Sequence, residues 1–101
     1  MTPYRIVIST TSERDVEAAA DWYDVEQPRL GLRFIHEVSA TYRRILDHPF
    51  GYQVLQMGVR RALVRRFAYA VYFIVENDVV EVIGVLHTSR DPSEWRRRSG
   101  R

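Results

Sequence analysis

The sequence contains no cysteine, no lysine and no apolar run long enough to cross a membrane. Without cysteine, the chain cannot carry disulfides, a thiolate zinc site or a cysteine nucleophile. Without a signal peptide or a long apolar run, we expect a cytoplasmic location and no membrane partner. Because lysine is absent, all fifteen permanently cationic side chains are arginine, whose planar guanidinium group suits bidentate contacts with phosphate or carboxylate.

No repeat, linker or low-complexity stretch divides the 101 residues, which suit a single domain spanning residues 1–101. Hydrophobic residues make up 46% of the chain, enough for a core rather than a disordered segment. The final residues 95–101, "WRRRSGR", predict a basic tail.

Charge is distributed unevenly along the chain. Residues 11–27 carry six acidic side chains and one basic side chain, Arg14. Residues 48–75 carry no acidic side chain and four basic ones: Arg60, Arg61, Arg65 and Arg66. This polarity favours an anionic partner on one side of the molecule, although solvated strand edges would give the same pattern.

Hydrophobic periodicity predicts two helices and four strands. Strands are expected at residues 4–9, 59–67, 68–75 and 79–88, and helices at residues 10–27 and 30–47. Thr11 or Ser12 is the expected cap of the first helix, and Trp22 and Tyr23 are its expected core aromatics. The apolar stripe of the second helix comprises Phe34, Val38, Thr41 and Ile45.

The order of these elements predicts an α+β fold: an N-terminal strand, a helical hairpin, then a three-stranded antiparallel meander. Short links between the last three strands require antiparallel pairing. The strand at residues 79–88 is apolar at both alternations, so we expect it at the centre of the sheet.

Residues suited to chemistry gather around the last strand. His87 and Arg90 follow its apolar run, and the meander arginines could share its sheet, with Tyr69, Tyr72 and Trp95 nearby. Such a basic hollow would suit phosphodiester cleavage by a neighbouring 2′-hydroxyl, which needs a base, an acid and cations. The alternative is a hydrogen-bonded strand end with a local Arg90–Asp91 pair. His36 and His48 have no ligand-like spacing with His87, so we expect no metal and no cofactor.

The segments "RRFAYAVYF" and "VLHTSRD", with "ADWYDVEQPRLGLRF" and "ILDHP" before them, resemble the RelE/ParE superfamily of toxins from type II toxin–antitoxin modules, also called plasmid stabilisation proteins. The resemblance covers roughly residues 4–96. It implies a helical hairpin packed on a mainly antiparallel sheet, and a cognate antitoxin that forms a hetero-oligomer with the chain.

The two branches of the superfamily imply different targets. RelE-like toxins cleave mRNA on the ribosome, whereas ParE-like toxins inhibit DNA gyrase by binding. If the chain is a ribonuclease, the resemblance implies that His87, Arg66 and Arg90 are catalytic. Under either reading the implied target-binding residues are Arg60, Arg61, Arg65, Arg66, Tyr69, Arg90 and Trp95. Trp95 stands where a cleaving toxin often has tyrosine, and the pattern His87-x-x-Arg90-Asp91 is closer to ParE. We therefore expect gyrase binding, with a ribosome-dependent endonuclease and an inactive binding module as the alternatives.

Overall fold

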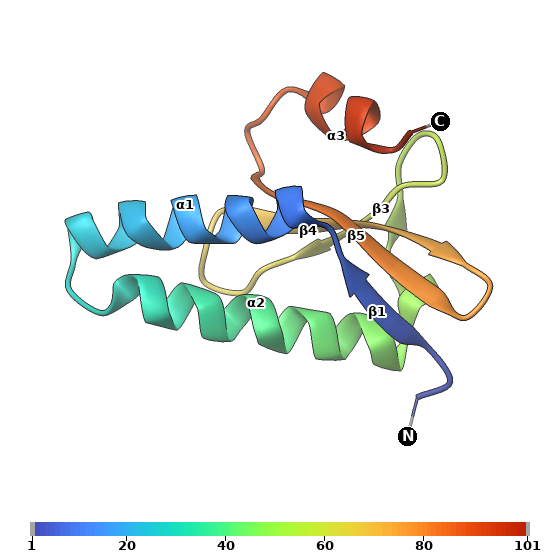
Figure 1. The fold of residues 1–101 in the computed structure, drawn as a ribbon, viewed down its shortest axis with the longest axis horizontal. Helices are drawn as coiled ribbons and strands as arrows, with labels where there is room; N and C mark the ends of the chain where they lie inside the picture. The colour runs from blue at the N-terminus through green and yellow to red at the C-terminus, as the bar shows by residue number, and fades with distance from the viewer. Residues whose placement is uncertain (1, 101) are drawn as a thin grey trace.

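The computed structural model describes residues 2–100 and contains one five-stranded sheet with helices on both faces (Figure 1). The strands are β1 (Arg5–Ile8), β2 (Gln53–Val54), β3 (Arg60–Leu63), β4 (Tyr69–Glu76) and β5 (Val79–His87). The helices are α1 (Thr10–Glu26), α2 (Leu30–Asp47), the short 3-10 helix η1 (Pro49–Gly51) and α3 (Pro92–Arg98). The expected α+β class and the order of its main elements are confirmed.

The strand order is β1-β5-β4-β3-β2. β1 runs parallel to β5, whereas β3, β4 and β5 form the predicted antiparallel meander. β5 lies between β1 and β4, as its apolar character on both alternations predicted. The sequence pattern missed β2, because a two-residue strand has no periodicity to detect.

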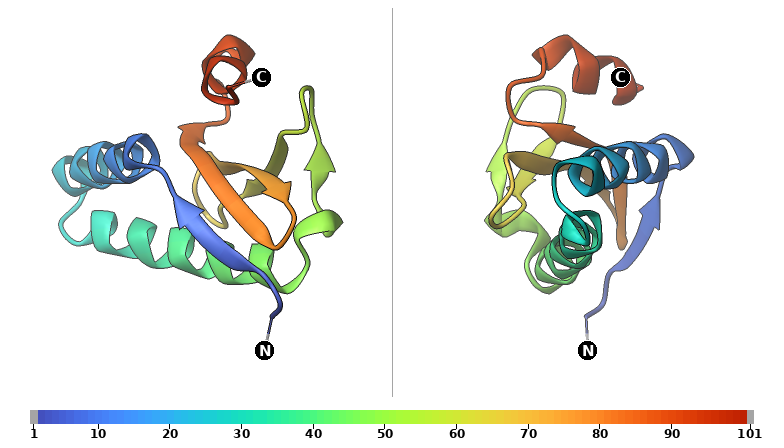
Figure 2. Two further views of the ribbon diagram at one scale, coloured as in Figure 1. Left: turned by 45° about the vertical axis from the view of Figure 1, so that its right-hand side comes forward. Right: turned by 90° about the vertical axis from the view of Figure 1, so that its left-hand side faces the viewer.

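The α1–α2 hairpin covers one face of the sheet, and α3 covers the other (Figure 2). α2 has the predicted bounds, and its four stripe residues are all buried. The cap of α1 is Ser9, two or three residues before the expected caps. The Ser9 hydroxyl caps α1 by accepting the Ser12 backbone N–H at 3.1 Å, and Ser12 is buried with its own hydroxyl donating to the Val82 carbonyl.

The strand predicted at residues 59–67 ends at Leu63, so Arg65 and Arg66 lie in the β3–β4 turn rather than on a strand. The Val64 backbone N–H donates to the Tyr69 carbonyl at 2.9 Å and closes this turn. Arg66 has a φ of 71°, in the left-handed region, which a continuing strand cannot contain.

The predicted basic tail is mostly the helix α3. Asp91 caps it by accepting the Ser93 backbone N–H at 2.8 Å, and Pro92 occupies its first turn, where proline is tolerated. Trp95 is only 6% exposed and stacks on Tyr72 with ring centroids 6.0 Å apart. Arg101, the last residue of the predicted tail, lies outside the described residues. Within residues 2–100, none of the helices is long and apolar enough to span a membrane.

Candidate functional site

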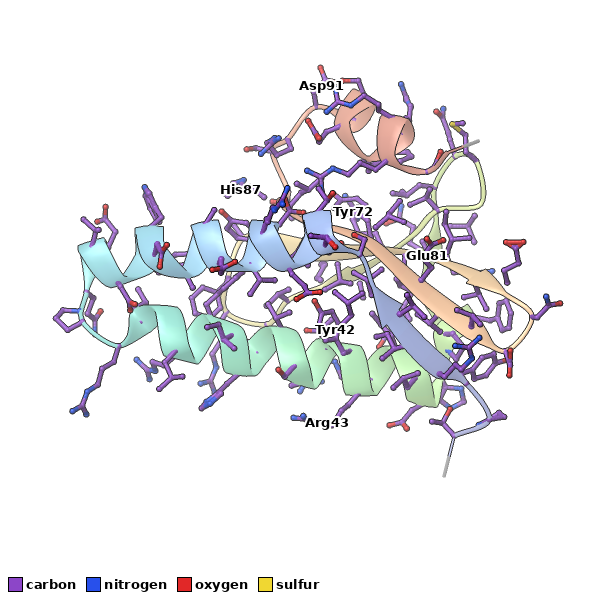
Figure 3. All side chains as sticks on the ribbon, viewed as in Figure 1. Tyr42, Arg43, Tyr72, Glu81, His87 and Asp91 are labelled. Carbon is purple, nitrogen blue, oxygen red and sulfur yellow. The ribbon has the colours of Figure 1, made fainter. Side chains whose placement is uncertain are left out.

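His87, the last residue of β5, lines a hollow of about 250 Å³ between the sheet and α1. The antiparallel register places Tyr69 directly opposite His87, and their rings meet edge to face with centroids 5.4 Å apart. Arg90 lines the same hollow from the segment that leads to α3, and Figure 3 shows His87 between α1 and that segment. We call this cavity the His87 hollow. It brings together three of the predicted site residues.

The orientation of the His87 ring is fixed by the next turn. The Ser89 backbone N–H donates to His87 Nδ1 at 3.1 Å, and the Ser89 hydroxyl lies 2.8 Å from the same nitrogen. Because Nδ1 accepts a backbone hydrogen bond, a neutral ring carries its proton on Nε2. The Nε2–H is then the donor that His87 can offer to a ligand.

Tyr69 and Arg90 give the His87 hollow a neutral donor and a cation. Burial raises the pKa of the Tyr69 hydroxyl, and although nearby Arg90 lowers it, the net direction is upward. The hydroxyl therefore stays protonated at neutral pH and acts as a donor. Arg90 is half exposed and its Nη2 lies 3.2 Å from the Glu94 carboxylate, so part of its charge is already neutralised.

The sequence interpretation missed two residues of the His87 hollow, Asp15 and Trp22, which α1 contributes. Trp22 is 58% exposed, so the prediction that it is a core aromatic is wrong. Asp15 serves the β5 edge that β1 leaves uncovered beyond Ile8, because its Oδ2 accepts the Val85 backbone N–H at 3.0 Å. The sequence carried no signal for this contact, which joins residues seventy positions apart.

Asp15 also fastens α3 to the body of the protein. Arg98 Nη1 lies 2.5 Å from Asp15 Oδ2, and Arg98 Nε lies 3.0 Å from the Glu94 carboxylate. Burial alone would lower the pKa of Arg98, but the hydrogen bonds and charges of Asp15 and Glu94 outweigh it and raise the pKa. A Cβ on Gly84 would come within 2.9 Å of Arg98 Nη1, so glycine leaves room for this guanidinium group.

The four meander arginines line other surfaces than the His87 hollow. Arg60 donates to the carbonyls of Phe50 and Tyr52 and lies over the Phe50 ring, so it fastens η1 to the sheet. Arg61 donates to the Gln53 side chain at 2.9 Å. Arg61 and Arg65 line one cavity, and Arg66 lines another. The expectation of one hollow shared by these arginines and His87 is therefore wrong: Arg65 and Arg66 lie in the turn beyond Leu63, and the two arginines on β3 contact η1 and β2.

Trp95 is buried in the second core, with Tyr72. The prediction that Trp95 presents its side chain to a target is therefore incompatible with this conformation, and the indole holds α3 against the sheet instead. An amphipathic cap-and-proline signal at "DPSEW" was present in the sequence and could have predicted a short helix with one buried side.

Comparison of the sequence with models of known protein families identifies the family of this chain. The model of the ParE toxin of the type II toxin–antitoxin system parDE matches residues 6–92. The chain belongs to the ParE toxin family. The resemblance to the RelE/ParE superfamily is thereby confirmed. A comparison with curated proteins gives no match.

Two solved structures share the fold of this ParE-family chain. A chain of the chromosomal ParDE toxin–antitoxin system from P. aeruginosa aligns with a TM-score of 0.75 and 15% identity, covering 83% of this chain and 95% of that one. A chain of the toxin–antitoxin complex RelBE2 from Mycobacterium tuberculosis aligns with a TM-score of 0.60 and 21% identity, covering 84% and 98%. At these identities the likeness is one of fold.

Proposed function

We propose that this chain inhibits cell growth by binding DNA gyrase without hydrolysis, and that a cognate antitoxin neutralises it. The match of residues 6–92 to the ParE toxin family carries the proposal. The placement of the expected catalytic residues supports it, because Arg66 lines a different cavity from His87 and Arg90. Acid–base catalysis on a phosphodiester needs its cation and its proton donor within reach of the same phosphate.

The groove between α1 and α2 supports a protein partner. Its lining includes Val16, Ile35 and Val38 together with Glu13 and Glu17, and its volume is about 500 Å³. Such a groove fits the apolar face of a helix. We propose that an antitoxin helix occupies it, because both structural neighbours come from toxin–antitoxin systems.

Growth and supercoiling assays test the main proposal. Expression of this chain alone should stop growth, and co-expression of its antitoxin should restore it. The purified chain should inhibit supercoiling by gyrase and leave translated mRNA intact. Normal growth without antitoxin would instead favour an inactive binding module.

A ribosome-dependent mRNA endonuclease is the second candidate, and the His87 hollow favours it. His87 Nε2–H and the Tyr69 hydroxyl could donate protons there, and Arg90 could stabilise negative charge. The variants His87→Ala and Tyr69→Phe separate the two candidates, with His48→Ala as a matched control for loss of an exposed imidazole. Under gyrase binding both variants keep cells arrested, and under cleavage both lose codon-positioned cuts in translated mRNA by about 100-fold or more.

A further inference from the structure

Five arginines line two hollows beside the β3–β4 turn, and none of them lines the His87 hollow. We call this set the arginine surface; it comprises Arg33, Arg44, Arg61, Arg65 and Arg66. Arg33 and Arg44 are eleven residues apart on α2, about three helical turns, so they lie on the same side of that helix. Arg65 and Arg66 project from the turn that crosses beside it.

Among residues 2–100, no carboxylate lies within ion-pair distance of a guanidinium group of the arginine surface. Arg44 donates to the Thr41 hydroxyl and the Leu63 carbonyl, and Arg61 donates to the Gln53 amide oxygen, all neutral groups. The carboxylates of Glu94 and Asp15 pair instead with arginines of the α3 region. Unneutralised arginines that crowd together favour a ligand with repeated negative charges.

Each side of the turn has a hollow with aromatic lining. The Arg66 hollow, of about 490 Å³, is lined by Tyr23, Phe67 and Ala68 besides Arg33 and Arg66. The Arg65 hollow, of about 480 Å³, has Tyr52 beside Arg65. Aromatic side chains next to a cationic track are typical of surfaces on which unpaired bases stack.

One carboxylate distinguishes a nucleic acid from an acidic peptide. Glu37 lines the Arg66 hollow and forms no side-chain ion pair with a described residue. It would repel the carboxylate of a peptide that entered the hollow. The same carboxylate can accept hydrogen bonds from the exocyclic amino group of a nucleobase.

We propose that the arginine surface binds single-stranded nucleic acid across the β3–β4 turn. Phosphates contact the arginines on the ridge of the turn, and an unpaired base enters the Arg66 hollow, where its amino group donates to Glu37. This contact goes beyond gyrase binding and does not depend on it.

Fluorescence anisotropy of a labelled oligonucleotide tests the proposal directly. The chain should bind a mixed-sequence single strand, of DNA or RNA, more tightly than the duplex of the same sequence. The double variant Arg65→Gln/Arg66→Gln should bind about tenfold more weakly at low salt. Its slope of log affinity against log salt should be shallower by about 1.4, because two phosphate contacts are lost.

A matched control removes the same charge elsewhere. Arg5 and Arg14 are exposed on β1 and α1, and Arg5→Gln/Arg14→Gln should leave the salt slope unchanged. The variant Glu37→Gln should alter the preference among bases while keeping the slope. Thermal unfolding of each variant checks that it is folded.

Three results would overturn the proposal. These are an equal loss in the Arg5/Arg14 control, tighter binding of the duplex, or tighter binding of an acidic Glu/Ala peptide that depends on Arg65 and Arg66. None of them bears on gyrase inhibition, which the supercoiling assay measures separately.

Discussion

Arginine gathers in two regions of this protein, the α3 region and the arginine surface, and the partners of the guanidinium groups differ between them. In the α3 region Arg90, Arg97 and Arg98 all pair with Glu94, and Arg98 also pairs with Asp15. On the arginine surface the hydrogen-bond partners are carbonyl, hydroxyl and amide oxygens. The first region therefore uses arginine to hold a helix in place, whereas the second leaves it available for a ligand.

Burial explains the two extremes of this difference, Arg98 on one side and the turn arginines on the other. Arg98 has a side chain only 15% exposed, and a buried guanidinium group without a carboxylate would be strongly destabilising. Arg65 and Arg66 are exposed, so water solvates their charge and no internal partner is needed. Substitutions in the α3 region should consequently lower stability, and substitutions on the arginine surface should change binding.

The largest expected effect is that of Trp95→Ala, which removes the buried indole beneath α3. We expect the free energy of unfolding to fall by about 4 kcal/mol, because a large cavity forms and the stacking on Tyr72 is lost. Chemical denaturation followed by circular dichroism measures the change. Trp22→Ala is the matched control, since its indole is 58% exposed and its loss should cost less than about 1 kcal/mol. Equal losses in the two variants would show that Trp95 is not an anchor.

Asp15→Ala should lower the free energy of unfolding by about 3 kcal/mol, because the Arg98 guanidinium loses one of its two carboxylate partners and the Val85 N–H loses its acceptor. Asp21→Ala, on the exposed side of the same helix, should change it by less than about 0.5 kcal/mol. The double variant Asp15→Ala/Arg98→Ala should lose less than the sum of the two single losses. Strict additivity would mean that the pair does not interact.

The sequence predicted α2 and β5 well, and the reason is visible in their residues. α2 has an unbroken apolar stripe between Leu30 and the proline that follows His48, so both ends were marked. β5 is apolar on both alternations, and this pattern is typical of a central strand whose two faces are both covered. The β3–β4 turn was hidden because the alternation of "VRRALVRRF" continues through it, although the backbone turns after Leu63.

The site was harder to predict than the fold. Tyr69 and His87 could be paired from the meander, because their strands are adjacent and antiparallel. Asp15 and Trp22 come from α1, and no local pattern says which helix residues meet the open edge of β5. The separation of Arg66 from His87 depends on the same hidden turn.

Acid should remove the stability that the Glu94 carboxylate contributes to the α3 region. The variant Glu94→Gln should show how large that contribution is. Burial acts to raise the pKa of Glu94, but hydrogen bonds from Arg98 and Arg90 outweigh it and hold the pKa below its usual value. A carboxyl group whose pKa is lowered in the folded state stabilises the protein at pH values above its unfolded pKa of about 4.3. This stabilising contribution is lost as the pH falls through the pKa of the folded state.

At pH 7 we therefore expect Glu94→Gln to be less stable than the parent by about 1 kcal/mol, from thermal or chemical unfolding. The difference should shrink as the pH falls below about 4, since both side chains are then neutral. A constant difference across the acid range would contradict the assigned role of the Glu94 charge.

The smallest expected effect sharpens the comparison, because its sign differs between two neighbouring residues of the arginine surface. Arg66 has a φ of 71°, in the left-handed region that favours glycine, whereas Arg65 does not. Arg66→Gly should therefore raise the free energy of unfolding by about 0.5 kcal/mol, and Arg65→Gly should lower it by a similar amount. Both variants should bind single-stranded nucleic acid more weakly, since each removes one guanidinium group. A gain in stability together with a loss of binding at Arg66 would indicate that arginine is kept in a strained conformation for its ligand; unchanged binding would leave that strain without a functional reason.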